Sequence, residues 1–95
     1  MFTNAPGKHA FPPVTLLKAA GVRVFAGNDN IRDAWWPYGN GDMLQRAMLI
    51  GYRCGFHTDE ELHVALEMAS TAAAQALDLT QYGIGIGQDA TFVVL

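Results

Sequence analysis

A five-residue segment rich in β-branched and aromatic residues and closed by glycines at both ends, Val22–Ala26, constrains the fold more than any other feature of this sequence. Its β-branched and aromatic residues predict a mostly buried β-strand. The preceding residues 14–20 have a helical pattern, because two prolines can occupy the first turn and Gly21 supplies a stop. A helix, a tight glycine turn and a strand in this order form one unit of an α/β fold, which is the fold class that we expect.

Two longer helices are expected further along the chain. A capping signal precedes an apolar stripe in residues 43–54, and Arg46 lies on the face opposite that stripe. Thr58 and Glu61 form a second capping box, which is followed by apolar residues at three-four spacing as far as Leu77. This second pattern predicts one continuous helix.

The two ends of the chain differ in character. Residues 1–13 contain three of the four prolines and are expected to form a loop. Residues 90–95 are apolar and predict a second strand. As a fragment, the chain is expected to be mostly helical. As a single domain or fragment, it divides into a loop at 1–13, a helix–strand–helix unit at 14–55, and a helix with a terminal strand at 56–95.

The composition excludes several classes of protein. Hydrophobic residues make up 51% and charged residues 16% of the 95 positions, which excludes a disordered polar tail. A folded chain of this size and composition is expected to keep some apolar surface exposed. The net charge is −3 and the six Lys and Arg residues are scattered, which argues against nucleic-acid binding. The single cysteine excludes an intramolecular disulfide framework, and no apolar run is long enough for a membrane span. A cytoplasmic protein is therefore expected.

Polar residues follow the predicted strand directly, in the sequence Gly-Asn-Asp-Asn at 27–30. Polar side chains at the carboxyl end of a strand point into the ligand crevice of α/β proteins, so Asp29 is a candidate metal ligand or general base. An Asx turn is the alternative interpretation, because Asn and Asp also favour turns. Trp35 and Trp36 could stack on a planar heterocycle or close a pocket, and packing of their loop against the core is the alternative.

Three other motifs are better explained without chemistry. His57 and Glu60 have the spacing of metal ligands, but they lie at a helix start, where acidic side chains interact favourably with the helix dipole. Residues 85–90 match G-x-G-x-x-A, yet they follow a helix and precede a strand, the reverse of a dinucleotide-binding motif. Cys54 lies on an apolar helical stripe and is interpreted as an inert thiol.

The sequences GNDNIRDAW at 27–35 and PYGNGDM at 37–43 together resemble the final metal-binding segment of cytosine-deaminase-like enzymes of the amidohydrolase superfamily. Further matches lie at Pro12-Pro13-Val14, at 70–74 and at Gly87-x-x-Ala90. The resemblance covers nearly the whole chain, whereas the chain covers roughly the last quarter of such a barrel enzyme.

This resemblance implies both a fold and a set of roles. In that family a (β/α)8 barrel holds a divalent metal, zinc or iron, with several histidines and an Asp at the end of the eighth strand. Asp29 would be that ligand, and would also accept a proton from the attacking water. Asn30 stands where cytosine deaminases have a second Asp, and Trp35 matches an aromatic residue that lines the pocket, so both are implied substrate contacts. Val22–Ala26 would be the eighth barrel strand, and residues 90–95 would return to a small β-domain.

The histidine ligands of that family have no counterpart in this chain. We therefore expect part of a metal-dependent amidohydrolase that hydrolyses a C–N bond of a small heterocyclic amine or amide, inactive until the rest of the barrel completes it. Whether the chain alone binds a metal is left open. The alternative is a small non-catalytic interaction module derived from such an enzyme, which becomes a homo-oligomer through its exposed apolar face.

Overall fold

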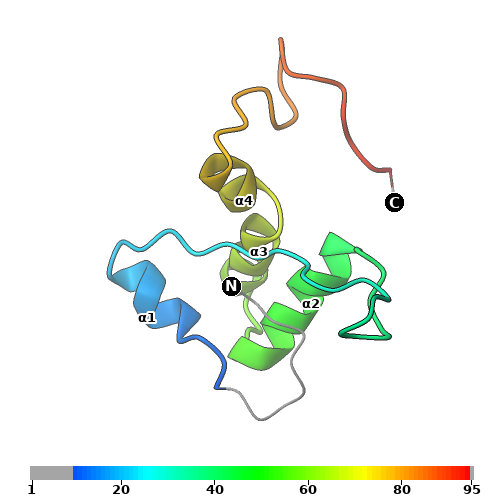
Figure 1. Cartoon of the computed structure of the whole chain (residues 1–95). Coiled ribbons are helices and arrows are strands. Elements are labelled where there is room, and N and C mark those ends of the chain that lie inside the picture. The colour runs from blue at the N-terminus through cyan, green and yellow to red at the C-terminus, as the bar shows by residue number, and fades with distance from the viewer. Residues whose placement is uncertain (1–9, 95) are drawn as a thin grey trace.

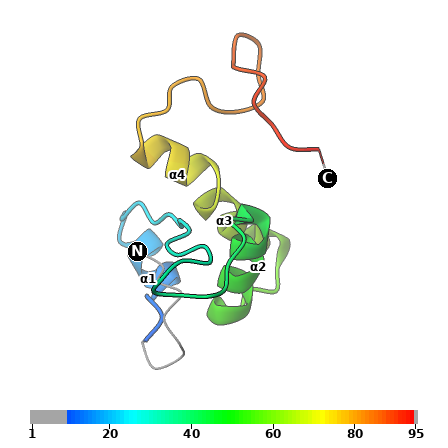
Figure 2. The ribbon, with the colours of Figure 1, turned by 45° about the vertical axis from the view of Figure 1, so that its right-hand side comes forward.

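The computed structural model describes residues 10–94, and its regular elements in that range are four α-helices (Figure 1). They are α1 (Val14–Ala19), α2 (Met43–Cys54), α3 (Asp59–Met68) and α4 (Thr71–Ala76). Helices α2 and α3 pack against each other, and α4 continues beyond α3. Figures 1 and 2 both show the segment after α4 extending away from the helices. The expectation of a mostly helical fragment is confirmed.

The starts of α2 and α3 are set by side chains that satisfy the first free backbone N–H groups. Asp42 Oδ1 accepts hydrogen bonds from the backbone N–H groups of Leu44 at 2.9 Å and Gln45 at 3.0 Å, which starts α2. The capping box predicted at the start of α3 is present, with Thr58 and Glu61 bonding to each other's backbone N–H groups. Helix α2 ends at Gly55, which has φ +70°.

The single helix predicted from Thr58 to Leu77 is divided at Ala69 and Ser70. The backbone carbonyl of Met68 accepts a hydrogen bond from the N–H of Ala26 at 2.8 Å, and the Ser70 hydroxyl donates to the Leu66 carbonyl at 2.6 Å. A serine hydroxyl that bonds back to the preceding turn competes with regular helix geometry. The sequence pattern could not show this division, because it depends on a contact with a distant segment.

The strand predicted at Val22–Ala26 is not formed, and residues 10–94 contain no strand at all. A strand needs a partner backbone, whereas Ala26 bonds to a helix carbonyl instead. Val22 and Phe25 are 48% and 46% exposed, so the prediction of a mostly buried segment is also wrong. The α/β class is therefore not seen in the described residues.

The second predicted strand, at 90–95, is likewise absent from its described residues 90–94. Phe92, Val93 and Val94 are exposed there, without a neighbouring strand to pair with. Leu95 lies outside the described residues, as do residues 1–9 of the predicted N-terminal loop. The placement of both segments in a barrel enzyme stays a prediction.

The core is small and consists mostly of short side chains. Its buried members come from α1, α2, α3 and the segment before residue 27: Val14, Ala26, Ala47, Ile50, Ala65 and Met68. The chain exposes 7327 Å², whereas a folded monomeric protein of its mass, 10.3 kDa, exposes about 5,400 Å². The chain therefore leaves about 2,000 Å² more surface uncovered than a free-standing domain does. No helix among the described residues is long and apolar enough to cross a membrane.

The capping box gives the chain a pH-dependent stability. Backbone hydrogen bonds from His57 and Thr58 hold the pKa of the Glu61 carboxyl below its ordinary value of 4.5. A carboxyl with a lowered pKa in the folded state stabilises the fold above that ordinary value, and this contribution is lost as the pH falls through the folded-state pKa. We expect the free energy of unfolding in urea to decrease below about pH 4.5, and to decrease less in Glu61→Gln. Equal pH slopes in the wild type and in Glu61→Gln would contradict this expectation.

Candidate functional site

The segment that carries Asp29 is held at two points by the helices. Before it, the N–H of Ala26 donates to the carbonyl of Met68 at the end of α3. Within it, Asn28 Oδ1 accepts two hydrogen bonds from the Arg46 guanidinium of α2, one from Nε at 2.7 Å and one from a terminal nitrogen. The Asp29 side chain is exposed, and its carboxylate has no hydrogen-bond or ion-pair partner within residues 10–94. The Asp29 carboxylate therefore takes no part in holding residues 10–94 together.

The Asx turn in this region is made by Asp33 rather than by Asp29. Asp33 Oδ1 accepts from the backbone N–H of Trp35 at 2.9 Å and of Trp36 at 3.0 Å. Asp33 Oδ2 accepts from Asn30 Nδ2 at 2.7 Å, and this bond is the main cause of a lowered pKa at Asp33. Asn30, the predicted substrate contact, thus has a defined role in closing the loop.

The loop after Asn30 folds back on itself through backbone bonds and a glycine. Arg32 N–H donates to the Tyr38 carbonyl at 3.1 Å, and a Cβ on Gly39 would lie 2.6 Å from the carbonyl oxygen of Asn30. Gly39 also has φ +104°, so this close approach requires glycine. The ring of Trp36 packs edge-on against that of Tyr38, with centroids 5.7 Å apart.

Trp35 projects from this loop and is 84% exposed. It does not pack against the core. Trp36 is half-buried, but its ring contacts Tyr38 of the same loop and it is not one of the side chains packed on the core cluster, so the core-packing alternative is not seen for Trp36 either. A largely exposed indole is free to meet a surface or ligand from outside the described residues. Its role as a substrate contact stays a prediction.

The described residues do not by themselves fit a metal ion. Residues 10–94 contain no cluster of three or more His, Cys, Asp or Glu side chains that could hold one. His57 Nδ1 lies 3.7 Å from Glu61 Oε2, within the cap of α3, and His63 Nε2 lies 3.9 Å from Glu67 Oε1 on the same helix. Asp29 would therefore need further ligands from outside this part of the chain.

Cys54 is not placed for nucleophilic chemistry. Its side chain is half-buried, and this burial raises the pKa of the thiol above its ordinary value. A raised pKa lowers the fraction of the reactive thiolate at neutral pH. This agrees with the interpretation of Cys54 as an inert thiol.

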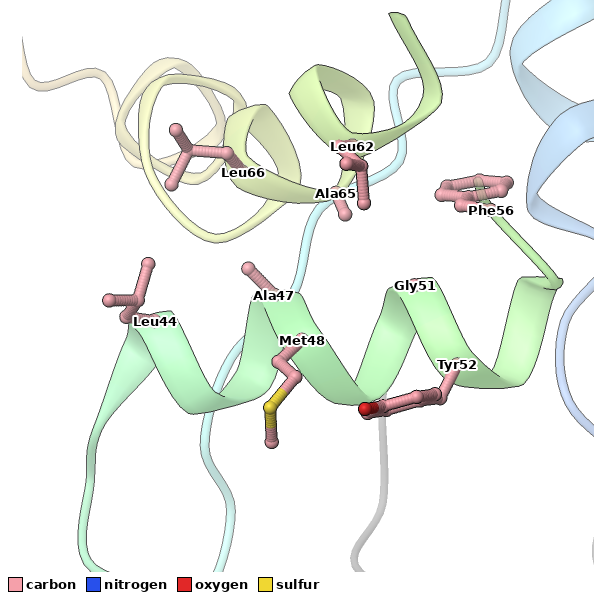
Figure 3. Close-up of a pocket in the computed structure, with 9 residues that line it drawn as sticks. All are labelled: Leu44, Ala47, Met48, Gly51, Tyr52, Phe56, Leu62, Ala65 and Leu66. Atoms are coloured by element: carbon pink, nitrogen blue, oxygen red, sulfur yellow. The ribbon is translucent and has the colours of Figure 1, made fainter. Parts of the chain in front are cut away.

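An apolar groove of about 470 Å³ lies between α2 and α3 (Figure 3). Ala47 and Ala65 point toward one another across it in Figure 3. The remaining lining residues are Leu44, Met48, Gly51, Tyr52, Phe56, Leu62 and Leu66. The lining contains no His, Cys, Asp, Glu, Lys or Arg side chain and no residue of the segment 27–42. The groove is therefore suited to apolar packing and not to catalysis.

Comparison with known proteins assigns the chain to a family. The chain belongs to the amidohydrolase family, whose model matches residues 1–95. This confirms the resemblance to the amidohydrolase superfamily that the sequence motifs indicated.

Among the relatives, the N-isopropylammelide isopropyl amidohydrolase of Pseudomonas sp. (strain ADP) is 39% identical over 84 residues, which cover 87% of this chain and 21% of that protein. The uncharacterized protein YahJ of Escherichia coli (strain K12) is 49% identical over 37 residues, covering 39% of this chain and 8% of YahJ. The crystal structure of N-isopropylammelide isopropylaminohydrolase from Burkholderia multivorans ATCC 17616 matches with a TM-score of 0.76 and 48% identity, over 85% of this chain and 21% of that one. The chain thus spans about a fifth of the length of its characterised relatives.

The structure adds one residue to the site that the sequence pattern placed wrongly. Arg46 was expected on the face of its helix opposite the apolar stripe, but it is only 8% exposed and contacts Asn28. A helical pattern assigns charged residues to the solvent face by default. An asparagine in the preceding loop, able to accept both guanidinium bonds, was the available signal, although sequence spacing alone does not bring the two together.

Proposed function

We propose that the chain provides part of the active site of an amidohydrolase that hydrolyses a C–N bond of a small heterocyclic amine or amide. Family membership and the two relatives named for N-isopropylammelide hydrolysis support this reaction class. The observation that carries the proposal is the Asp29 carboxylate, exposed and unpartnered, directly after a segment anchored to both α2 and α3.

In this proposal Asp29 is one ligand of a divalent metal, zinc or iron, and the other ligands come from polypeptide outside residues 10–94. Asn30 and Trp35 contribute to the substrate pocket, Trp35 through its exposed indole ring. Residues 22–26 pair with neighbouring barrel strands in the complete enzyme, which would satisfy the backbone groups that find no strand partner in the described part of this chain.

The sharpest test is a segment exchange. Residues 1–95 replace the matching fifth of the Pseudomonas relative, and hydrolysis of N-isopropylammelide is measured with bound metal and thermal unfolding. A folded chimera that binds metal and hydrolyses the substrate would support the proposal. A chimera that has the same unfolding temperature as the relative, and is therefore folded, but that neither binds metal nor hydrolyses the substrate would contradict it.

A non-catalytic interaction module is the second candidate function, and the uncovered surface of about 2,000 Å² favours it. One partner in a standard interface contributes about 800 Å², so the chain has enough surface to associate with a second copy of itself. The apolar groove between α2 and α3 is the face proposed for this contact, since its rim carries half-exposed leucines and no charge.

The isolated chain is therefore expected to self-associate in a concentration-dependent manner. Leu62→Lys places a charge in the groove. It should raise the dissociation constant of the self-association by about 10- to 100-fold, because the burial of one leucine side chain is lost. Leu16→Lys on α1 is the matched control, because Leu16 is 70% exposed and lies outside the groove. Sedimentation equilibrium measures both. A compact monomer at high concentration would contradict this candidate.

A further inference from the structure

Arg46 has an unusual environment for a charged residue. It is only 8% exposed, and none of the ion pairs within the described residues involves it. Its guanidinium instead donates two hydrogen bonds to one neutral acceptor, Asn28 Oδ1. A buried guanidinium is costly unless its donors are bonded, so the helix that carries Arg46 and the loop that carries Asn28 are coupled to each other.

This pair also fixes the orientation of the Asn28 amide. A guanidinium has donors only, so the amide must present its oxygen to Arg46 and turn its nitrogen away. Asn28 Nδ2 is buried and has no hydrogen-bond partner in the described part of the chain. The contact with Arg46 is therefore what holds the Asn28 side chain there, with no second bond to replace it.

The position of this contact links it to the candidate site. Asn28 immediately precedes Asp29, and Ala26 is anchored to the carbonyl of Met68. Two anchors on separate helices thus define the backbone path up to Asp29, one through a main-chain bond and one through Arg46. Catalytic groups need this kind of support, because a displacement of about 1 Å can reduce the rate by about 100-fold.

We propose that Arg46 is a positioning residue: through Asn28 it fixes the backbone from which the Asp29 carboxylate projects. The inference rests on the proposed function of Asp29 for its catalytic consequence, and on the observed contact alone for its structural consequence. Arg46 itself touches no reacting group in this proposal.

The structural consequence is tested by hydrogen exchange in the 95-residue chain. Arg46→Met removes the donors but keeps a long side chain that suits a helix. We expect exchange in a peptide covering residues 24–30 to become at least about tenfold faster at Ala26, whose N–H donates to the Met68 carbonyl, while a peptide around Ile50 in α2 keeps its protection. Arg53→Met is the matched control: Arg53 is an exposed residue of the same helix whose guanidinium lies over the Phe11 ring, and its loss should change neither peptide.

The catalytic consequence is tested by kinetics in the chimera described above. We expect Arg46→Met to lower kcat at least about tenfold with KM within about threefold, and Arg46→Lys, which can still donate to Asn28 Oδ1, to recover part of the loss. In Arg46→Met combined with Asn28→Ala the two losses should not add, because both variants break the same contact.

The outcomes separate the two proposals. Unchanged exchange at residues 24–30 in Arg46→Met overturns the positioning role, whatever the activity. Faster exchange with full kcat overturns the catalytic consequence. Full activity in Asp29→Ala overturns the proposed function of Asp29, while faster exchange in Arg46→Met would still establish the contact as the support of the loop.

Discussion

Replacing Asp29 by alanine is expected to reduce turnover in the complete enzyme by about 10²- to 10⁴-fold and to reduce the amount of bound metal. The carboxylate is exposed and makes no bond within residues 10–94, so its removal should not cost folding stability in the metal-free protein. A loss of activity without a change in the unfolding temperature of the metal-free protein is the signature of a functional group. Steady-state kinetics, metal analysis and thermal unfolding on one preparation measure the turnover, the bound metal and the unfolding temperature.

Two variants make this result specific. Asp29→Asn keeps the size of the side chain but removes its charge, and it should behave like Asp29→Ala. Trp35→Ala should chiefly raise KM or alter substrate preference, at a cost of a few kcal/mol in transition-state binding, because an exposed indole contributes contact area. Full activity and full metal content in Asp29→Ala would show that residues 27–30 are only a connection.

The second large effect concerns the chain by itself. Purified residues 1–95 are expected to release no ammonia or amine from cytosine or related heterocycles, with or without added zinc or iron. The reason is a lack of metal ligands. The described residues, Asp29 included, contain no group of three or more side chains able to hold a metal. The assay is amine release in the presence of each metal, with the complete relative as the positive control. Metal-dependent release that disappears in Asp29→Ala would contradict this expectation.

The helices were the predictable part of the fold, because their signals are local. The caps at Asp42 and Thr58 each depend on residues within one turn of the helix start. Those signals placed α2 and the start of α3 correctly. The division at Ser70 was not predictable, since it involves a bond between Met68 and a residue far away in the sequence.

The segments predicted as strands show the opposite case. Val22–Ala26 has the composition of a strand, but composition does not provide the neighbouring backbone on which a strand depends. Within the site, the motif led to Asp29 and missed Arg46, because a charged residue on an amphipathic helix is assigned to solvent by pattern. Asp33 was missed although its signal is local: its bonds reach only Trp35, Trp36 and Asn30, two or three residues away, and Asp favours turns of this kind.

The bond between the Ala26 N–H and the Met68 carbonyl has a consequence for how the molecule opens. When the last turn of α3 frays, it releases the start of the Asp29 segment at the same moment, so the two belong to one cooperative unit of local unfolding. Residues 77–94 make no such bond to this unit, and they can open without disturbing it. Partial denaturation should therefore loosen the C-terminal segment first and leave the geometry around Asp29 intact until α3 itself unravels.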